Sequence, residues 1–365
     1  MNIATANLED NAMVHLTYDT GLQQRLPCIF LRDNDQNELH PDTKERIFDL
    51  TKADIDVTPV SLRADNDTLY IRWPDRDQDA VYDAKWLSCQ GSLNDPAIVP
   101  KQTWDASFAD KITEFDAGCV EEKSTLLSML TQLKQDGIVL ITGLEDNETA
   151  GLGFGKHISF MRDSNFGLTF EVISKANPNN LAYTAIDLPL HTDLPNQELV
   201  PGYQFFHCYR NEATGGESTY CDGFKVAEDL RDQDPEAFEL LTTVAQPFRF
   251  FDDGADVRYA RPVIELDADG DIAQIAFNGH LAQTPALEGN ALKAYYRAYQ
   301  SLMRRLRSDE YVIEFKLQPQ TMIVVDNRRV LHGRVAFDPS TGYRHLQGYY
   351  IDHAEIDSRI RVLAR

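Results

Sequence analysis

The feature that most constrains the fold of this chain is a series of short, strand-like segments in its second half. Each segment is rich in β-branched and aromatic residues and is bounded by turn-forming residues. Antiparallel strands in such number avoid exposed edges by folding into two facing sheets. We therefore predict a double-stranded β-helix, or jelly roll. The segments are 202–210, 218–223, 248–252, 260–267, 272–278, 311–317, 321–327 and 344–352.

The first hundred residues also alternate in the manner of short strands and predict a small β domain. The segments 14–19, 26–34, 57–66 and 68–75 are β-rich, and Asn66-Asp67 is a candidate hairpin turn. A stretch rich in proline and polar residues follows at 94–104 and is typical of a linker. We therefore expect two domains, a small N-terminal β domain over 1–97 and a catalytic domain over 98–365.

Helices are expected around the strands of the second domain. Leu126, Met129, Leu130 and Leu133 recur at helical spacing, and Gly137 is placed to end that helix. Similar patterns predict helices near 147–160, 224–242 and 289–307. The expected fold class is thus mainly β with flanking helices (α+β).

Composition excludes several classes of partner. With 35 basic and 58 acidic residues the formal net charge is −23, which disfavours binding to nucleic acid or to an anionic membrane. The five cysteines lack metal-binding spacing. The first residues lack the basic start and apolar core of a signal peptide, so we expect a cytoplasmic protein. With nucleic acid and membranes disfavoured, we expect it to act on a small molecule.

The stretch "LPLHTDLP" at 188–195 carries the first sign of chemistry. In an extended segment His191 and Asp193 share one face, and together they supply two of the three ligands of an iron(II) facial triad. His332 follows 141 residues after His191 and supplies the missing imidazole. Arg344 comes twelve residues later and is able to hold a carboxylate bidentately. This joint spacing is that of iron(II)- and 2-oxoglutarate-dependent oxygenases.

The sequence around these residues resembles the γ-butyrobetaine hydroxylase branch of that superfamily, which also contains trimethyllysine hydroxylase and is related to taurine dioxygenase. The resemblance runs from about residue 26 to the C-terminus. It implies a small N-terminal β domain, a catalytic double-stranded β-helix and usually a homodimer. The matching stretches are "LPCIFLRDN", "YIRWPD", "NNLAYT", "LHTD", "ATGGESTYCDGF", "IAFN", "DNRRVLHGR" and "YRHLQGYYID".

The resemblance also implies the cofactors. His191, Asp193 and His332 would bind Fe(II), which leaves positions for 2-oxoglutarate and O2. Arg344 would pair with the distal carboxylate of 2-oxoglutarate, and Ser218 matches the family position that adds a hydrogen bond to it. The expected reaction is hydroxylation.

On the substrate side, the family holds a trimethylammonium group in an aromatic cage. The matching positions are Phe166, Phe170, Tyr183 and Tyr350, and ring faces attract a quaternary cation without a hydrogen bond. Asn180 and Asn278 match amides near the anionic end of the substrate. Leu194 departs from the aromatic hydroxyl donor of the γ-butyrobetaine enzyme. This departure favours 2-(trimethylammonio)ethylphosphonate as substrate, with γ-butyrobetaine, hydroxylated to carnitine, as the alternative.

A second departure concerns zinc. Some relatives hold a structural zinc ion with three Cys and one His, and the matching residues here are Asp35, Asn37, His40 and Asp77, so we expect no structural zinc.

Two other interpretations remain open. A non-catalytic module could bind a betaine in the cage, but binding needs no open metal positions. A metal-dependent hydrolase in a cupin-like barrel would leave Arg344 without a role.

Overall fold

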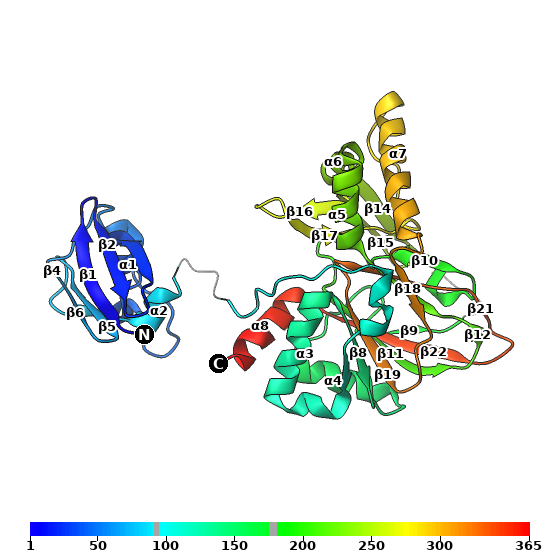
Figure 1. The fold of residues 1–365 in the computed structure, drawn as a ribbon, viewed down its shortest axis with the longest axis horizontal. Helices are drawn as coiled ribbons and strands as arrows, with labels where there is room; N and C mark the ends of the chain where they lie inside the picture. The colour runs from blue at the N-terminus through cyan, green and yellow to red at the C-terminus, as the bar shows by residue number, and fades with distance from the viewer. Residues whose placement is uncertain (91–94, 175–180) are drawn as a thin grey trace. The chain divides into compact units, whose positions relative to one another are not determined.

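The computed structural model describes residues 1–90, 95–174 and 181–365, and it divides the chain into two compact units, Met1–Asp95 and Pro96–Arg365. The division lies two residues before the expected boundary at 97. Figure 1 shows the ribbon of both units.

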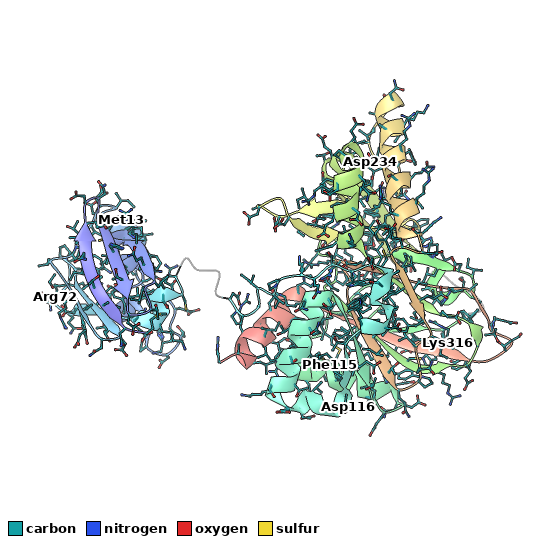
Figure 2. All side chains as sticks on the ribbon, in the orientation of Figure 1. Met13, Arg72, Phe115, Asp116, Asp234 and Lys316 are labelled. Carbon is teal, nitrogen blue, oxygen red and sulfur yellow. The ribbon has the colours of Figure 1, made fainter. Side chains whose placement is uncertain are left out.

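The first unit contains two three-stranded antiparallel sheets and two short helices. One sheet has the order β1-β2-β3 and the other β4-β5-β6, and both enclose a core around Trp73, which is fully buried. Trp86 is only partly buried at the edge of this core. Met13 and Arg72, labelled in Figure 2, begin β2 and end β5. The elements are β1 (Ile3–Glu9), β2 (Met13–Tyr18), β3 (Gln23–Pro27), α1 (Cys28–Asp33), β4 (Ser61–Asp65), β5 (Thr68–Arg72), β6 (Asp79–Asp83) and α2 (Ala84–Ser88).

The strand expected at 26–34 is wrong, because β3 ends at Pro27 and the chain turns into α1. Proline fixes its φ at −59° and precedes the first helical residue. Cys28 and Leu31, three residues apart, then face the core together, as a helix allows and a strand does not. The predicted hairpin at Asn66-Asp67 is confirmed, since Asp65 pairs with Thr68 and Asn66 has φ +51°.

The second unit is built on two sheets. One has the order β10-β20-β13-β18 and the other β7-β8-β19-β11-β22-β9. Phe115 and Asp116, labelled in Figure 2, lie on the edge strand β7, which is parallel to β8. The strands are β7 (Glu114–Asp116), β8 (Ile138–Thr142), β9 (Phe170–Val172), β10 (Leu188–His191), β11 (Tyr203–Asn211), β13 (Ser218–Asp222), β18 (Val312–Phe315), β19 (Thr321–Asp326), β20 (Val330–Arg334) and β22 (Arg344–Ile351).

Strand alternation separates the two faces of the larger sheet. On β19, Met322 and Val324 pack under α3 (Lys123–Asp136), α4 (Glu148–Ile158) and α8 (His353–Leu363). Ile323 and Val325 point the other way and meet Tyr220 of the smaller sheet. The core between the sheets therefore follows from the two-residue period of buried strands. The predicted jelly roll with flanking helices is confirmed.

Helices also cover the outer face of the smaller sheet, where α5 (Gly223–Gln233), α6 (Pro235–Thr243) and α7 (Gly289–Leu306) pack together (Figure 1). The segment predicted as helical near 224–242 is two helices. Pro235 forces Asp234, labelled in Figure 2, out of the helical region, and the Asp234 side chain accepts a hydrogen bond from the backbone N–H of Ala237 to start α6.

The strands expected at 248–252, 260–267 and 272–278 lie outside both main sheets and belong to two-stranded ribbons. These ribbons are β14 (Gln246–Phe251) with β15 (Asp256–Arg261), and β16 (Ile264–Leu266) with β17 (Ile272–Ile275). A further ribbon, β12 (Thr214–Gly215) with β21 (Phe337–Asp338), was not predicted.

Candidate functional site

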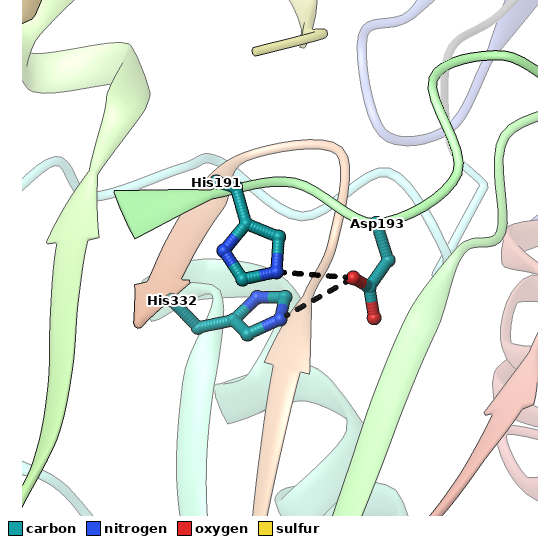
Figure 3. A group of neighbouring side chains, drawn as sticks. All are labelled: His191, Asp193 and His332. Atoms are coloured by element: carbon teal, nitrogen blue, oxygen red, sulfur yellow. Dashed lines mark ion pairs between the residues drawn. The ribbon is translucent and has the colours of Figure 1, made fainter. Parts of the chain in front are cut away.

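The three predicted metal ligands converge between the two sheets (Figure 3). His191 ends β10 and pairs directly with His332 on β20. The Oδ1 atom of Asp193 lies 3.3 Å from Nε2 of His191 and 3.6 Å from Nε2 of His332. These ligand atoms lie within 4.8 Å of one another, and no second such group of His, Cys, Asp and Glu occurs in the described residues.

Asp193 reaches this position through a bend rather than through strand alternation alone. Strand β10 ends at His191, and Leu194 adopts φ +55°, a left-handed conformation that costs about 1–2 kcal/mol for a residue with a side chain. Asn327 offsets this strain by holding both backbone groups of Asp193. Its Oδ1 accepts from the Asp193 N–H at 2.7 Å, and its Nδ2 donates to the Asp193 carbonyl at 3.1 Å.

Hydrogen bonds also orient the ligand side chains. Nδ1 of His191 lies 2.9 Å from the Pro189 carbonyl, which directs Nε2 toward Asp193. The other carboxylate oxygen of Asp193 accepts hydrogen bonds from the Tyr350 hydroxyl at 2.7 Å and from the Gln204 amide.

The protonation states suit a metal. Burial by itself would raise the pKa of Asp193, but the neighbouring His332 and His191 hold it well below its ordinary value. Burial lowers the pKa of His332. A carboxylate and neutral imidazoles are the forms that bind iron(II), so this donor set fits the ion.

A smaller cavity adjoins His332 and contains the two residues predicted to bind 2-oxoglutarate. Ser218 on β13 and Arg344 on β22 line it, together with Arg334. Arg334 and Arg344 are 4% and 5% exposed, and neither Nε atom has a hydrogen-bond partner among the described residues. Among the described residues, no carboxylate forms an ion pair with the guanidinium of Arg334 or of Arg344. Because buried unpaired charge is costly, this cavity fits an anionic group such as the distal carboxylate.

A larger cavity of about 320 Å³ is bordered by His191, Asp193 and His332 together. Every described residue predicted to contact the substrate lines this cavity, whereas Asn180 lies outside the described residues. Among the described residues, seven phenylalanine and tyrosine rings contribute to its wall: Phe166, Phe170, Tyr183, Phe206, Phe250, Phe251 and Tyr350.

The rings contact one another edge to face and stacked. Phe170 stacks on Tyr350 at 5.3 Å and meets Phe206 edge-on at 5.8 Å, while Phe166 meets Phe250 edge-on at 5.3 Å. Gly348 makes room for Phe170, because a Cβ at that position would lie 2.3 Å from its Cζ atom. The absence of a side chain at Gly348 therefore positions one wall of the larger cavity.

Asn278 lines the larger cavity but is largely engaged by the backbone. Its Oδ1 accepts from the N–H groups of His280 at 3.0 Å and Leu281 at 3.3 Å, and its Nδ2 donates to the Thr192 carbonyl at 3.3 Å. One N–H of the amide remains for a ligand. His280 and Arg249 also line this cavity and were not predicted.

Sequence reasoning missed other residues of the site as well. Gln204 and Phe206 lie on β11, and their two-residue spacing places both side chains toward the interior. That periodicity is a signal that could have identified them. Phe250 lies on the β14–β15 ribbon, and no local pattern indicates that this ribbon reaches the cavity.

The residues that replace the zinc ligands in the first unit hold turns. The Asp35 carboxylate accepts from the Asn37 N–H at 2.9 Å, and Asn37 donates to the Asp79 carbonyl at 3.1 Å. Nδ1 of His40 accepts from the N–H groups of Asp42 and Thr43. The absence of structural zinc stays a prediction.

Comparisons with known proteins agree with this geometry. The family model described as taurine catabolism dioxygenase TauD, TfdA family matches residues 109–350, and the model of the N-terminal domain of γ-butyrobetaine-hydroxylase-like proteins matches residues 6–88. The γ-butyrobetaine dioxygenase of Pseudomonas sp. (strain AK-1) is 37% identical over 96% of this chain and 94% of its own length. The human γ-butyrobetaine dioxygenase is 30% identical over 92% of this chain and 90% of its own.

A more distant sequence relative and a solved structure also match this chain. The mitochondrial trimethyllysine dioxygenase of Homo sapiens is 28% identical over 93% of this chain and 83% of its own length. The crystal structure of a taurine dioxygenase from Burkholderia xenovorans matches with a TM-score of 0.52 at 14% identity, over 69% of this chain and 89% of that one. In the described part of the chain, no helix has the length and apolar character needed to cross a membrane.

The facial triad, the buried arginine cavity and these matches lead to one conclusion. The chain belongs to the TauD/TfdA family and is an iron(II)- and 2-oxoglutarate-dependent dioxygenase.

Proposed function

We propose that this dioxygenase hydroxylates a small zwitterion that carries a trimethylammonium group. The observation that carries the proposal is the wall of the larger cavity, where seven phenylalanine and tyrosine rings of the described residues lie beside the triad. Among its described lining residues, Asp193 is the one carboxylate, and it is engaged with the two histidines. A permanent cation in such a cavity is stabilised by ring faces, each contributing about 0.5–2 kcal/mol.

The names of the relatives support the same class of substrate. The relatives from Pseudomonas and from Homo sapiens are named for γ-butyrobetaine and trimethyllysine, and both compounds contain a trimethylammonium group. The shared feature of these substrates is thus the cation that the ring wall suits.

Each group of residues has a distinct role in the proposed reaction. Bound iron(II) supplies the oxidation chemistry, in which O2 is reduced as 2-oxoglutarate is decarboxylated to succinate and the substrate is hydroxylated. Arg344 and Ser218 bind and orient the distal carboxylate of 2-oxoglutarate. The rings hold the cation and exclude water, which fixes the substrate carbon that faces the triad. Tyr350 and Gln204 keep the Asp193 carboxylate oriented.

For the anionic end we propose a phosphonate, so that the substrate is 2-(trimethylammonio)ethylphosphonate. Leu194 supports this proposal. It lines the larger cavity, is 5% exposed and offers no hydroxyl where the γ-butyrobetaine enzyme has a donor. The second candidate is γ-butyrobetaine, favoured by the 37% identity to the enzyme from Pseudomonas.

Turnover with each compound decides between the two substrates. Iron-loaded protein is incubated with O2, 2-oxoglutarate and one compound at a time, and succinate and hydroxylated product are measured. We expect faster turnover of the phosphonate; equal or faster turnover of γ-butyrobetaine overturns that assignment. Turnover of neither compound overturns the trimethylammonium proposal.

A His191→Ala variant separates catalysis from binding. We expect it to bind the substrate and to form no succinate. If the wild-type protein binds a betaine and also forms no succinate, the protein is a binding module instead. Activity without O2 and 2-oxoglutarate would indicate a hydrolase.

We also propose that the protein is a homodimer, on the resemblance stated above. Light scattering on the purified chain measures this directly, and a mass of 41.4 kDa would indicate a monomer.

A further inference from the structure

Arg334 is a buried cation next to the triad. The proposed reaction gives Arg334 no role. It follows His332 by two residues on β20, so the two side chains share one face of the strand. Its neighbours across the sheet are Leu188 on β10 and Ser218 on β13, and it is 4% exposed. Arg334 therefore lies beside Ser218, which is one of the two residues predicted to bind 2-oxoglutarate.

One edge of the Arg334 guanidinium holds the chain that carries Tyr183. Its NH1 atom donates to the Ala182 carbonyl at 3.3 Å, and its NH2 atom donates to the carbonyls of Thr184 and Ile186, both at 2.8 Å. These carbonyls flank Tyr183, whose ring lines the larger cavity. The position of one ring of the substrate wall thus depends on Arg334.

Arg334 also lines the smaller cavity, as Arg344 does. The buried Nε of Arg334 has no hydrogen-bond partner among the described residues, and the same holds for Nε of Arg344. The Cζ atoms of Arg334 and Arg344 lie 5.0 Å and 5.7 Å from the centroid of the Phe337 ring. Two buried positive charges that line one small cavity repel each other, and an anion bound in that cavity offsets the repulsion.

We propose that Arg334 is a positioning residue that couples the two cavities. A dicarboxylate in the smaller cavity offsets the repulsion from Arg344 and fixes Arg334, and Arg334 then holds residues 182–186 so that Tyr183 completes the wall for the cation. That the ligand of the larger cavity is a trimethylammonium compound rests on the proposed function. The coupling between the smaller cavity and residues 182–186 is independent of that function. Because coupling is reciprocal, the trimethylammonium substrate also raises the affinity for 2-oxoglutarate.

The first test uses the wild-type protein and needs no variant. Amide hydrogen exchange is followed in the Fe(II)-loaded enzyme under nitrogen, with and without 2-oxoglutarate. The N–H of Thr184 donates to the Leu181 carbonyl, and the N–H of Phe337 donates to the Ala185 carbonyl, so both report on this segment. We expect 2-oxoglutarate to slow exchange at both amides. Unchanged exchange at saturating 2-oxoglutarate overturns the proposal.

The second test measures the coupling as a change in affinity. Calorimetry under nitrogen gives the Kd of the phosphonate and of γ-butyrobetaine with and without 2-oxoglutarate. In the wild type we expect 2-oxoglutarate to lower the Kd by about fivefold or more, within the usual range for coupled sites. In Arg334→Lys, which keeps the charge but loses the fork of donors, we expect the ratio to fall to about one.

Two matched variants exclude a general effect of losing an arginine. Arg210→Lys changes an exposed arginine and should keep the wild-type ratio. Arg344→Lys should weaken 2-oxoglutarate binding itself while exchange in the absence of 2-oxoglutarate stays as in the wild type. A wild-type ratio in Arg334→Lys overturns the proposal.

The outcomes also separate this inference from the proposed function. If neither compound binds but 2-oxoglutarate still slows exchange at Thr184, the substrate assignment fails and the coupling stands. If the compounds turn over without any dependence of their Kd on 2-oxoglutarate, the coupling fails and the function stands.

Discussion

The two cavities that meet at His332 differ in the side chains that line them. The larger one is walled by aromatic rings, with its single described carboxylate engaged by the histidines. The smaller one contains two buried guanidiniums without carboxylate partners in the described residues. Ring faces attract a cation without paying a large desolvation cost, whereas a buried arginine is stable only with its anion. We therefore expect changes in the smaller cavity to act more strongly than changes in the larger one.

The largest effect is expected from removing Arg344. Arg344→Met leaves the distal carboxylate of 2-oxoglutarate without its bidentate partner, which costs roughly 2–3 kcal/mol and raises the KM for 2-oxoglutarate by about 100-fold. Steady-state kinetics at saturating trimethylammonium substrate measures this change. A KM within threefold of the wild type would show that the cavity does not bind the carboxylate.

Gly348→Ala should disturb the larger cavity alone. The new Cβ would lie 2.3 Å from Cζ of Phe170, so that ring must move and the wall opens. We expect the KM for the trimethylammonium substrate to rise by roughly tenfold, as for the loss of a well-placed ring contact, with little change for 2-oxoglutarate. An equal rise in both values would contradict the separation of the two cavities.

An effect of similar or smaller size is expected from Tyr183→Leu, which removes one ring and keeps an apolar side chain. Loss of one cation–π contact of about 0.5–2 kcal/mol raises the KM for the substrate by roughly 2- to 30-fold. Tyr183→Phe is the matched control and should stay close to the wild type, because the ring face remains. Equal kinetics in the Leu and Phe variants would argue against a role for the ring.

His207 lies outside both cavities, so a substitution there should change the stability of the fold and leave both KM values unchanged. It is fully buried on β11, and burial lowers its pKa from 6.5 to about 4. Between pH 6.5 and 4 the unfolded chain binds a proton at His207 that the folded protein does not bind. The stability associated with the neutral, buried imidazole is therefore fully present above pH 6.5, and the free energy of unfolding decreases as the pH falls to 4. The loss is on the order of 3 kcal/mol.

We expect His207→Gln to flatten the fall in unfolding free energy between pH 6.5 and 4 while both KM values stay unchanged. The exposed His157→Gln is the control and should keep the wild-type slope. Urea denaturation at several pH values measures the slope, and an unaltered slope in His207→Gln would count against a neutral, buried imidazole.

Much of the site was predictable because its chemistry is local to short motifs. The spacing of His191, Asp193, His332 and Arg344 identified the metal ligands and the arginine, and the ring positions matched a known motif. The helical period also identified α3, which buries one face in the core. Continuous runs rich in β-branched and aromatic residues identified β19 and β22, which bury both faces.

Some local predictions failed where a single residue acts against the periodic pattern. At 26–34 the β-rich composition suggested a strand, but Pro27 and the shared burial of Cys28 and Leu31 favour helix α1. At 224–242 Pro235 divides the helix. In both cases proline changes the backbone in a way that hydrophobic spacing does not record.

The sequence by itself determined the strand-rich fold class, the iron ligands and the position of Arg344, because these follow from residue type and spacing. The aromatic residues expected around the substrate came from the resemblance to a known family. Only the tertiary structure decided that Arg334 lies beside Ser218 and holds the carbonyls around Tyr183, and that Phe250 reaches the larger cavity. The physical reason is that these contacts join residues more than 80 positions apart. Strand register and ribbon packing determine which side chains meet at such separations, and no local pattern encodes that register.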